Sequence, residues 1–205
     1  SLVADYPLQL YSVSNPEILN TVNFLLNNCF HAGGFFQDMI HSGINAYLTL
    51  DIAQTLLRHN DPRFQELVKA VANLATSTGQ WPEAIHPITG GGCMGDGQHG
   101  WAAAEWIMMI RNMFVREESD CLILFSGVFP EWLVSSAEIS FGPTLTPYGP
   151  ISVSLIKENN EVHASIDATW RNTPSQIIVA VPGYEKVHIF DTSRPLRLKP
   201  LTNNE

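Results

Sequence analysis

Basic residues are scarce in this chain of 205 residues. Lys and Arg together number 11, against 20 Asp and Glu, and the formal net charge is -9. Proteins that bind nucleic acid or an anionic membrane surface depend on clustered positive charge that neutralises phosphates. The sequence contains no basic run, so it predicts neither a nucleic-acid partner nor a membrane partner.

Long apolar runs and disulfide patterns are also missing. Apolar stretches such as residues 101–110 fall short of the roughly 20 residues that cross a bilayer. The three cysteines stand at irregular spacing, which favours a reducing compartment and hence the cytoplasm over a disulfide framework. The chain begins SLVADYPLQL, without an initiator Met or a signal pattern, and we interpret this start as a truncation or processing point.

What is present predicts a folded protein whose first half is helical. Hydrophobic residues make up 45% of the chain and charged residues 15%, enough apolar material for a packed core. Apolar residues recur at helical spacing after Asn15 and Pro16, a cap and a first-turn proline. The same spacing predicts four helices in total, over residues 16–29, 43–58, 64–74 and 101–116.

The second half has the shorter period of strands. Six strand-like runs separated by turn residues follow residue 120, at 121–125, 138–141, 151–156, 162–168, 176–181 and 186–190. Several strands at this spacing are typical of an antiparallel β-sandwich. The sequence therefore predicts an α+β protein in two parts, helical hairpins over residues 1–118 and a sandwich over residues 119–205.

The loop at residues 79–100, GQWPEAIHPITGGGCMGDGQHG, is too long and too rich in aromatic and titratable groups for an ordinary linker. Trp81 and Glu83 flank a proline, so an indole and a carboxylate are held together. An aromatic ring can pack on the face of a sugar, and a carboxylate can bind hydroxyls or activate water. Glu83 is the predicted catalytic base; the alternative is that it caps the turn or pairs with a surface arginine.

Other chemistry for this loop is less well supported. His86, Cys93, Asp96 and His99 match no zinc spacing, and the glycines lack the Lys and Ser/Thr of a phosphate loop, so we predict no metal and no cofactor. His86 and His99 are interpreted as sugar ligands, with a packed core histidine as the alternative for His99. Asp96 is the predicted N-cap of the next helix.

Two helices bring further candidates to the same site. Glu105 shares a helix face with Trp101, and we predict that it is structural, paired with Arg111 or Arg116. At the start of an earlier helix, His41, Asn45 and Tyr47 are interpreted as residues that line the cleft. The predicted substrate-binding residues are thus Trp81, His86, His99, Trp101, His41 and Asn45.

The segments QWPEAIHPITGGGCMGDGQHGWAAAEWIMMIRNMF, LILFSGVFPEWL and SFGPTLTPYGPISVSL resemble the C-terminal end of (α/α)6-barrel glycoside hydrolases of the rhamnosidase, glucoamylase and debranching types. In those enzymes a loop between late helices carries a catalytic carboxylate, which Glu83 matches, and a β-sandwich closes the chain. The resemblance implies a fragment whose partner is the remainder of the helical barrel, inactive alone.

The general acid that such an enzyme requires has no clear match. Asp38 lies in a short polar stretch and Asp51 inside a predicted helix, and we interpret both as poor candidates. Two hypotheses follow: hydrolysis of a neutral oligo- or polysaccharide with Glu83 as base, or non-catalytic carbohydrate binding or scaffolding. Acidic substrates are disfavoured because residues 79–100 contain no Lys or Arg.

Overall fold

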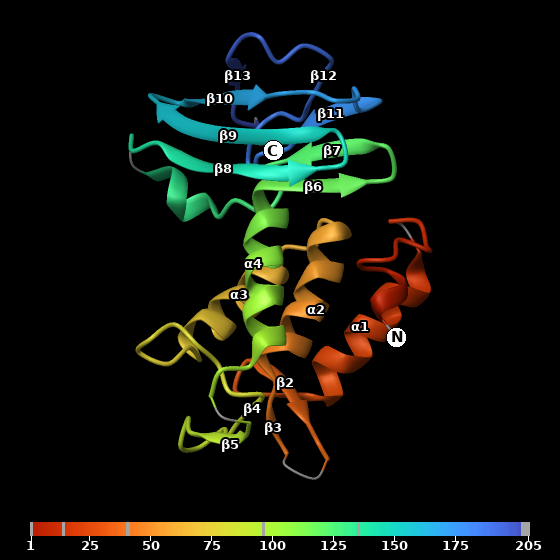
Figure 1. Ribbon diagram of the computed structural model, residues 1–205, viewed down its shortest axis with the longest axis vertical. Helices are drawn as coiled ribbons and strands as arrows, with labels where there is room; N and C mark the ends of the chain where they lie inside the picture. The colour runs from red at the N-terminus through yellow and green to blue at the C-terminus, as the bar shows by residue number, and fades with distance from the viewer. Residues whose placement is uncertain (1, 14, 40–41, 96, 135, 202–205) are drawn as a thin grey trace. The chain divides into compact units, whose positions relative to one another are not determined.

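The computed structural model describes residues 2–13, 15–39, 42–95, 97–134 and 136–201 (Figure 1). The chain divides into two compact units, residues 1–110 and 111–205, and each is described by itself. The division lies inside the fourth helix, whereas the sequence placed the change after residue 118. Within the described ranges, no helix has both the length and the apolar character of a membrane span.

The described residues of the first unit form four α-helices, and two of these helices begin at a capping side chain. They are α1 (Pro16–Asn28), α2 (Ala46–Arg58), α3 (Phe64–Asn73) and α4 (Gly100–Phe114), with a short 3-10 turn, η1 (Leu2–Ala4), before them. The Asn15 side chain accepts the Glu17 N–H, and the Asn45 side chain accepts the Leu48 N–H. Such caps satisfy free N–H groups of a first turn. The four predicted helices are confirmed, with shifted ends.

A five-stranded antiparallel sheet in this unit was not predicted. Its strands are β1 (Phe30–His31), β2 (Gly34–Gln37), β3 (Gly43–Ile44), β4 (Ala84–Ile85) and β5 (Gly92–Met94), in that order. The β3 strand occupies residues that were expected to start a helix. Gly43 permits this pairing, since a Cβ there would lie 2.9 Å from the Ile85 carbonyl oxygen. The sheet joins residues 30–44 to the long loop.

The second unit contains two four-stranded sheets. Their orders are β13-β10-β9-β8 and β12-β11-β7-β6, and every pairing is antiparallel except β7 with β11. The strands are β6 (Val115–Glu118), β7 (Cys121–Leu124), β8 (Ile139–Thr146), β9 (Gly149–Glu158), β10 (Glu161–Ala168), β11 (Gln176–Val179), β12 (Val187–Ile189) and β13 (Leu196–Leu198), with a 3-10 segment, η2 (Pro130–Val134).

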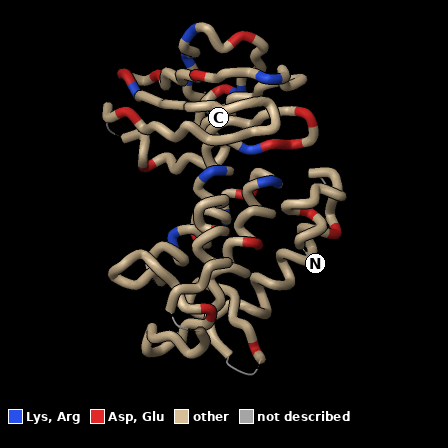
Figure 2. The backbone as a smooth tube through the Cα atoms, in the orientation of Figure 1, with Lys and Arg blue, Asp and Glu red and all other residues tan. Residues whose placement is uncertain are grey.

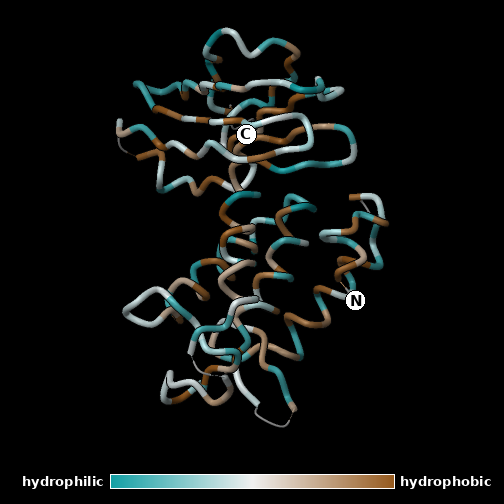
Figure 3. Tube along the Cα trace, viewed as in Figure 1, coloured by the Kyte–Doolittle hydropathy of each residue, from teal (hydrophilic) through white to brown (hydrophobic). Residues whose placement is uncertain are grey.

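Alternating burial gives these strands one covered face. On β9, Ile151, Val153 and Leu155 are buried while the residues between them are half-exposed, and the hydropathy colouring alternates along the strands in the same way (Figure 3). A period of two is what a sheet with one core face requires. The strand pattern in the sequence is therefore confirmed as antiparallel sheet structure.

The resemblance to (α/α)6-barrel enzymes is wrong as a description of this fold. The described residues form four α-helices and three largely antiparallel sheets, and no helical toroid. The reason lies in residues 30–44 and 84–94, which pair as short strands where a barrel would need helical hairpins. The chain is a mixed α+β protein. Because its helices do not form part of a toroid, the expected partner, the remainder of a helical barrel, has no basis in this fold.

Candidate functional site

An aromatic pair and a carboxylate pair meet between α2 and α4. Tyr47 and Asp51 are four residues apart on α2, and Trp101 and Glu105 are four apart on α4, so each helix presents a ring and a carboxylate on one face. The Tyr47 and Trp101 rings lie 5.5 Å apart, edge to face. All four residues belong to the first unit.

The two carboxyl groups interact electrostatically. Burial, followed by the charge of Glu105, raises the pKa of Asp51 to about 6. Burial also raises the pKa of Glu105, against the hydrogen bond that Gln54 donates to it at 2.8 Å. In a half-buried pair of like charges one partner holds its proton to a higher pH than an ordinary carboxyl does, and such pairs cluster at functional sites.

The predicted structural role of Glu105 takes a different form. Arg111 and Arg116 were its expected partners, but they pair with Glu117 and Glu118 in the second unit, at 2.5 Å and 3.1 Å. The Glu105 carboxylate is satisfied by Gln54 from α2 instead. The Gln54 amide donates a hydrogen bond but carries no positive charge. The Glu105 carboxylate therefore still repels the negative charge of Asp51.

Glu83 lies on the loop directly before β4. Its N–H donates to the Met94 carbonyl at 3.2 Å, and Pro82 packs so closely on Gly92 that a Cβ there would lie 2.9 Å from the proline. Glu83 itself is half-buried. Neither the turn cap nor the arginine pair proposed as its alternative role is seen among the described residues. The backbone of this predicted base is thus held from two sides.

Trp81 and His86 stabilise the loop. Trp81 is 4% exposed, donates its indole N–H to the Val71 carbonyl at 2.8 Å and packs on Trp106, so its ring offers no free face to a sugar. The exposed His86 accepts the N–H groups of Ile88 and Thr89 at its Nδ1, both at 3.2 Å. That nitrogen is used within the turn.

His99 and Trp101 form the accessible part of the predicted site. The Trp101 side chain is 67% exposed, and the His99 ring stacks on it at 6.1 Å. The His99 N–H donates to the Trp81 carbonyl, which ties the start of α4 to the loop. Its Nδ1 is buried without a hydrogen-bond partner in the described structure. With Tyr47 these residues make a continuous aromatic surface.

The remaining predicted residues do not join this surface as ligands. Asn45 is 3% exposed, and its side chain donates to Gln37 at 2.9 Å while capping α2, so it links β2 to the helix. His41 and Asp96 lie outside the described residues. Among the residues that are described, no three of His, Cys, Asp or Glu gather in a group that could hold a metal ion.

The chain matches no protein-family model, no curated protein and no solved structure. A functional assignment therefore depends on the geometry of the site alone. From the sequence, Trp101 was predicted to bind substrate and Glu105 to be structural. Asp51 was interpreted as a poor general acid because it lies inside a predicted helix. The sequence did contain a signal for this site: an aromatic residue is followed four residues later by a carboxylate at Tyr47 and Asp51, and again at Trp101 and Glu105.

Proposed function

We propose that this protein acts on a neutral oligo- or polysaccharide and hydrolyses its glycosidic bonds by general acid–base catalysis. The observation that carries the proposal is the meeting of two interacting carboxyl groups, Asp51 and Glu105, with the exposed ring of Trp101. Glycosidic hydrolysis needs one carboxyl that holds a proton and another that is ionised. An aromatic ring beside them suits the C–H face of a sugar.

The charge of the surroundings supports a neutral substrate. Residues 1–57 and 70–110 contain no Lys or Arg (Figure 2). Arg58 and Arg111, in the last turns of α2 and α4, are paired with Asp5 and Glu117. The charge of Asp51, Glu105 and Glu83 therefore disfavours an anionic saccharide. A neutral saccharide is bound through hydroxyls and ring faces and meets no such barrier.

In this proposal Asp51 is the general acid and Glu83 the general base. A pKa of about 6 keeps about half of Asp51 protonated at about pH 6 and about a tenth at about pH 7, so the acid that protonates the leaving oxygen is available at mildly acidic pH. Glu83 takes the proton of the attacking water. Glu105 acts on the reaction through Asp51, whose proton it retains by repulsion, and is therefore a positioning residue.

The test is hydrolysis of aryl glycosides and neutral oligosaccharides by the full chain and by Glu83→Gln and Asp51→Asn. Loss of a general acid or base commonly lowers kcat by about 10² to 10⁴. We expect that loss in both variants, with azide restoring turnover to the Glu83 variant. Glu66→Gln, at an exposed carboxylate on α3, is the matched control and should keep full activity.

Failure of the wild-type chain to hydrolyse any glycoside would refute the catalytic proposal. Loss of activity in Asp51→Asn with full activity in Glu83→Gln would move the base to Glu105, which Glu105→Gln would then test. The melting temperature of each variant separates lost chemistry from lost folding.

Non-catalytic carbohydrate binding is the second candidate, and the exposure of Trp101 favours it. A ring that is 67% exposed and backed by Tyr47 and His99 costs free energy in water unless something covers it. The two candidates differ in one measurement. A binding protein loses saccharide affinity in Trp101→Ala and turns over nothing, whereas the hydrolase loses both affinity and turnover.

A further inference from the structure

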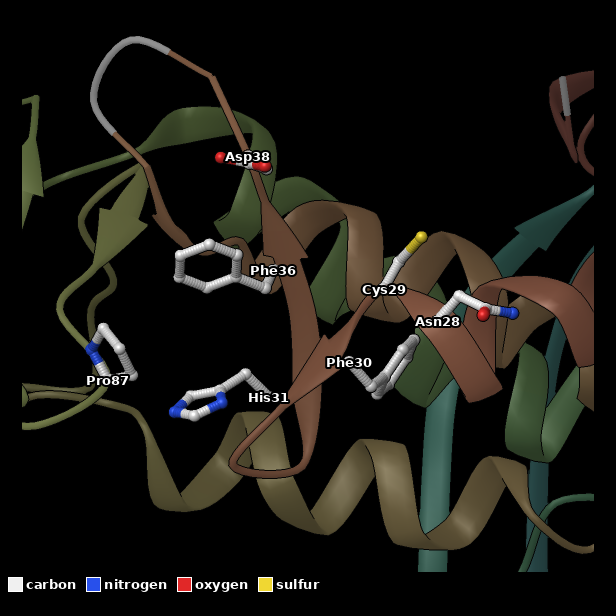
Figure 4. Close-up of a pocket in the computed structure, with 7 residues that line it drawn as sticks. All are labelled: Asn28, Cys29, Phe30, His31, Phe36, Asp38 and Pro87. Carbon is white, nitrogen blue, oxygen red and sulfur yellow. The ribbon is translucent and has the colours of Figure 1, made fainter.

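A concave surface lies at the β1–β2 hairpin. It is a pocket of about 520 Å³ (Figure 4). Its lining comes from the end of α1, both strands of the hairpin and the long loop, and consists of Asn28, Cys29, Phe30, His31, Phe36, Asp38 and Pro87. Apart from Asp38, which was weighed as a general acid, none of these residues was predicted from the sequence to bind a ligand.

Rings and one carboxylate shape this pocket. Phe36 and Asp38 are two residues apart, which places them on the same side of the extended chain. The rings of His31 and Phe36 lie 6.0 Å apart in an edge-to-face arrangement. In Figure 4, His31, Phe36 and Pro87 surround one end of the pocket and Asp38 lies beyond Phe36. The walls are thus apolar rings with polar groups among them.

This lining selects the charge of a ligand. It includes no Lys or Arg, and Asp38 is an exposed carboxylate, so the charge of the lining disfavours an anion. A pyranose has C–H faces for the rings of Phe36 and Pro87, and hydroxyl groups for the Asp38 carboxylate and the His31 imidazole. The volume is within the range of small-ligand pockets.

The sheet sets the separation between this pocket and the predicted base. Phe36 on β2 pairs with Ile44 on β3, and Ile44 pairs with Ile85 on β4, so β2 and β4 are two strand spacings apart. At roughly 4.8 Å per spacing this is about 10 Å. Glu83 directly precedes β4. A saccharide of a few units that reaches Glu83 can therefore also reach the pocket.

We propose that the β1–β2 pocket is a binding subsite for a further unit of the saccharide that the protein acts on, with Phe36 as the stacking ring and Asp38 as the hydroxyl acceptor. This inference rests on the proposed function for its ligand class. It adds a residue set outside the α2–α4 face, and it implies a preference for longer chains over disaccharides.

Calorimetric binding to the full chain tests the subsite, with neutral disaccharides and pentasaccharides of matched linkage as probes. We expect Phe36→Ala to weaken pentasaccharide binding about tenfold, the scale of one lost ring contact. Asp38→Asn should weaken it less and, at an exposed position, leave folding unchanged. Phe190→Ala, at a 77% exposed ring in the other unit, is the control and should bind as wild type.

Unchanged pentasaccharide affinity in both pocket variants would overturn the subsite and leave the proposed hydrolysis standing. Binding that depends on Phe36 and Asp38, in a wild-type protein that cleaves nothing, would sustain the subsite and refute the hydrolysis. No binding of any oligosaccharide would overturn both. Tetramethylammonium is the further probe: its binding, lost in Asp38→Asn and unmatched by sugars, would make this a cation site and overturn the saccharide assignment.

Discussion

Replacing Asp51 by Asn should stabilise the first unit, and the gain should depend on pH. The carboxyl has an ordinary pKa of 3.8 and a pKa of about 6 in the folded protein. Between these values the folded chain keeps a proton that the unfolded chain releases. Stability therefore falls as pH rises through this window, and above about pH 6 the folded state bears the whole cost of the charged carboxylate.

The size of this effect follows from the shift. A difference of 3.8 to about 6 corresponds to about 3 kcal/mol at about pH 8. At about pH 4 the folded carboxyl is almost fully protonated and the unfolded one is about half ionised, so the cost is only about 0.6 kcal/mol. The asparagine keeps the shape of the side chain and carries no charge at either pH. The free energy of unfolding of Asp51→Asn should therefore exceed that of the wild type by up to these amounts at the two pH values.

Urea unfolding of wild type and Asp51→Asn at about pH 8 and about pH 4 measures both values by linear extrapolation. Glu105→Gln is the companion variant, because removal of its charge should lower the pKa of Asp51 and shift the pH window downward. A variant no more stable than wild type at the higher pH would refute the reasoning. So would a gain that does not shrink at the lower pH.

Three further outcomes concern stability. Asp5→Asn should cost about 3–5 kcal/mol in urea unfolding, because Asp5 is fully buried against the buried Arg58 at 2.5 Å and the asparagine removes the negative charge of this buried pair. Gly149→Ala should lower the melting temperature sharply, since Gly149 has a φ of +132° and an added Cβ would clash with the Thr169 carbonyl oxygen. Trp81→Phe should cost about 0.5–1.5 kcal/mol by circular dichroism melting, because it removes the indole hydrogen bond to the Val71 carbonyl, which keeps the Leu74 N–H at 3.1 Å.

Short strands explain the main error in the expected fold. Two-residue strands such as Phe30–His31 and Ala84–Ile85 carry no readable alternation. The first pairs with residues 34 and 35 in a hairpin, whereas the second pairs with Ile44, far away in the chain. The loop around them was recognised as unusual from its composition. Its conversion into part of a sheet required the pairing of Ile44 with Ile85, a contact that no local pattern encodes.

The site divides in the same way between local and distant causes. A spacing of four residues places a ring and a carboxylate on one face of each helix, and for Trp101 and Glu105 this shared face was predicted from the sequence. The sequence did not distinguish a core residue from a ligand-binding residue. Trp81 and Trp101 belong to one aromatic-rich segment, yet Trp81 is 4% exposed and Trp101 is 67% exposed. Burial depends on what the rest of the chain places over a residue, and residue type does not report it.

By itself the sequence determined the helices, through apolar spacing and the cap at Asn15, and the strands after residue 120, through alternation. These signals are local, so they act within one turn or one strand. Tertiary structure alone decided that Asp51 meets Glu105 and that Gln54 bonds a carboxylate 51 residues away. Desolvation and repulsion between charges depend on distance in space, and for that reason the raised pKa of Asp51 exists only in the folded chain.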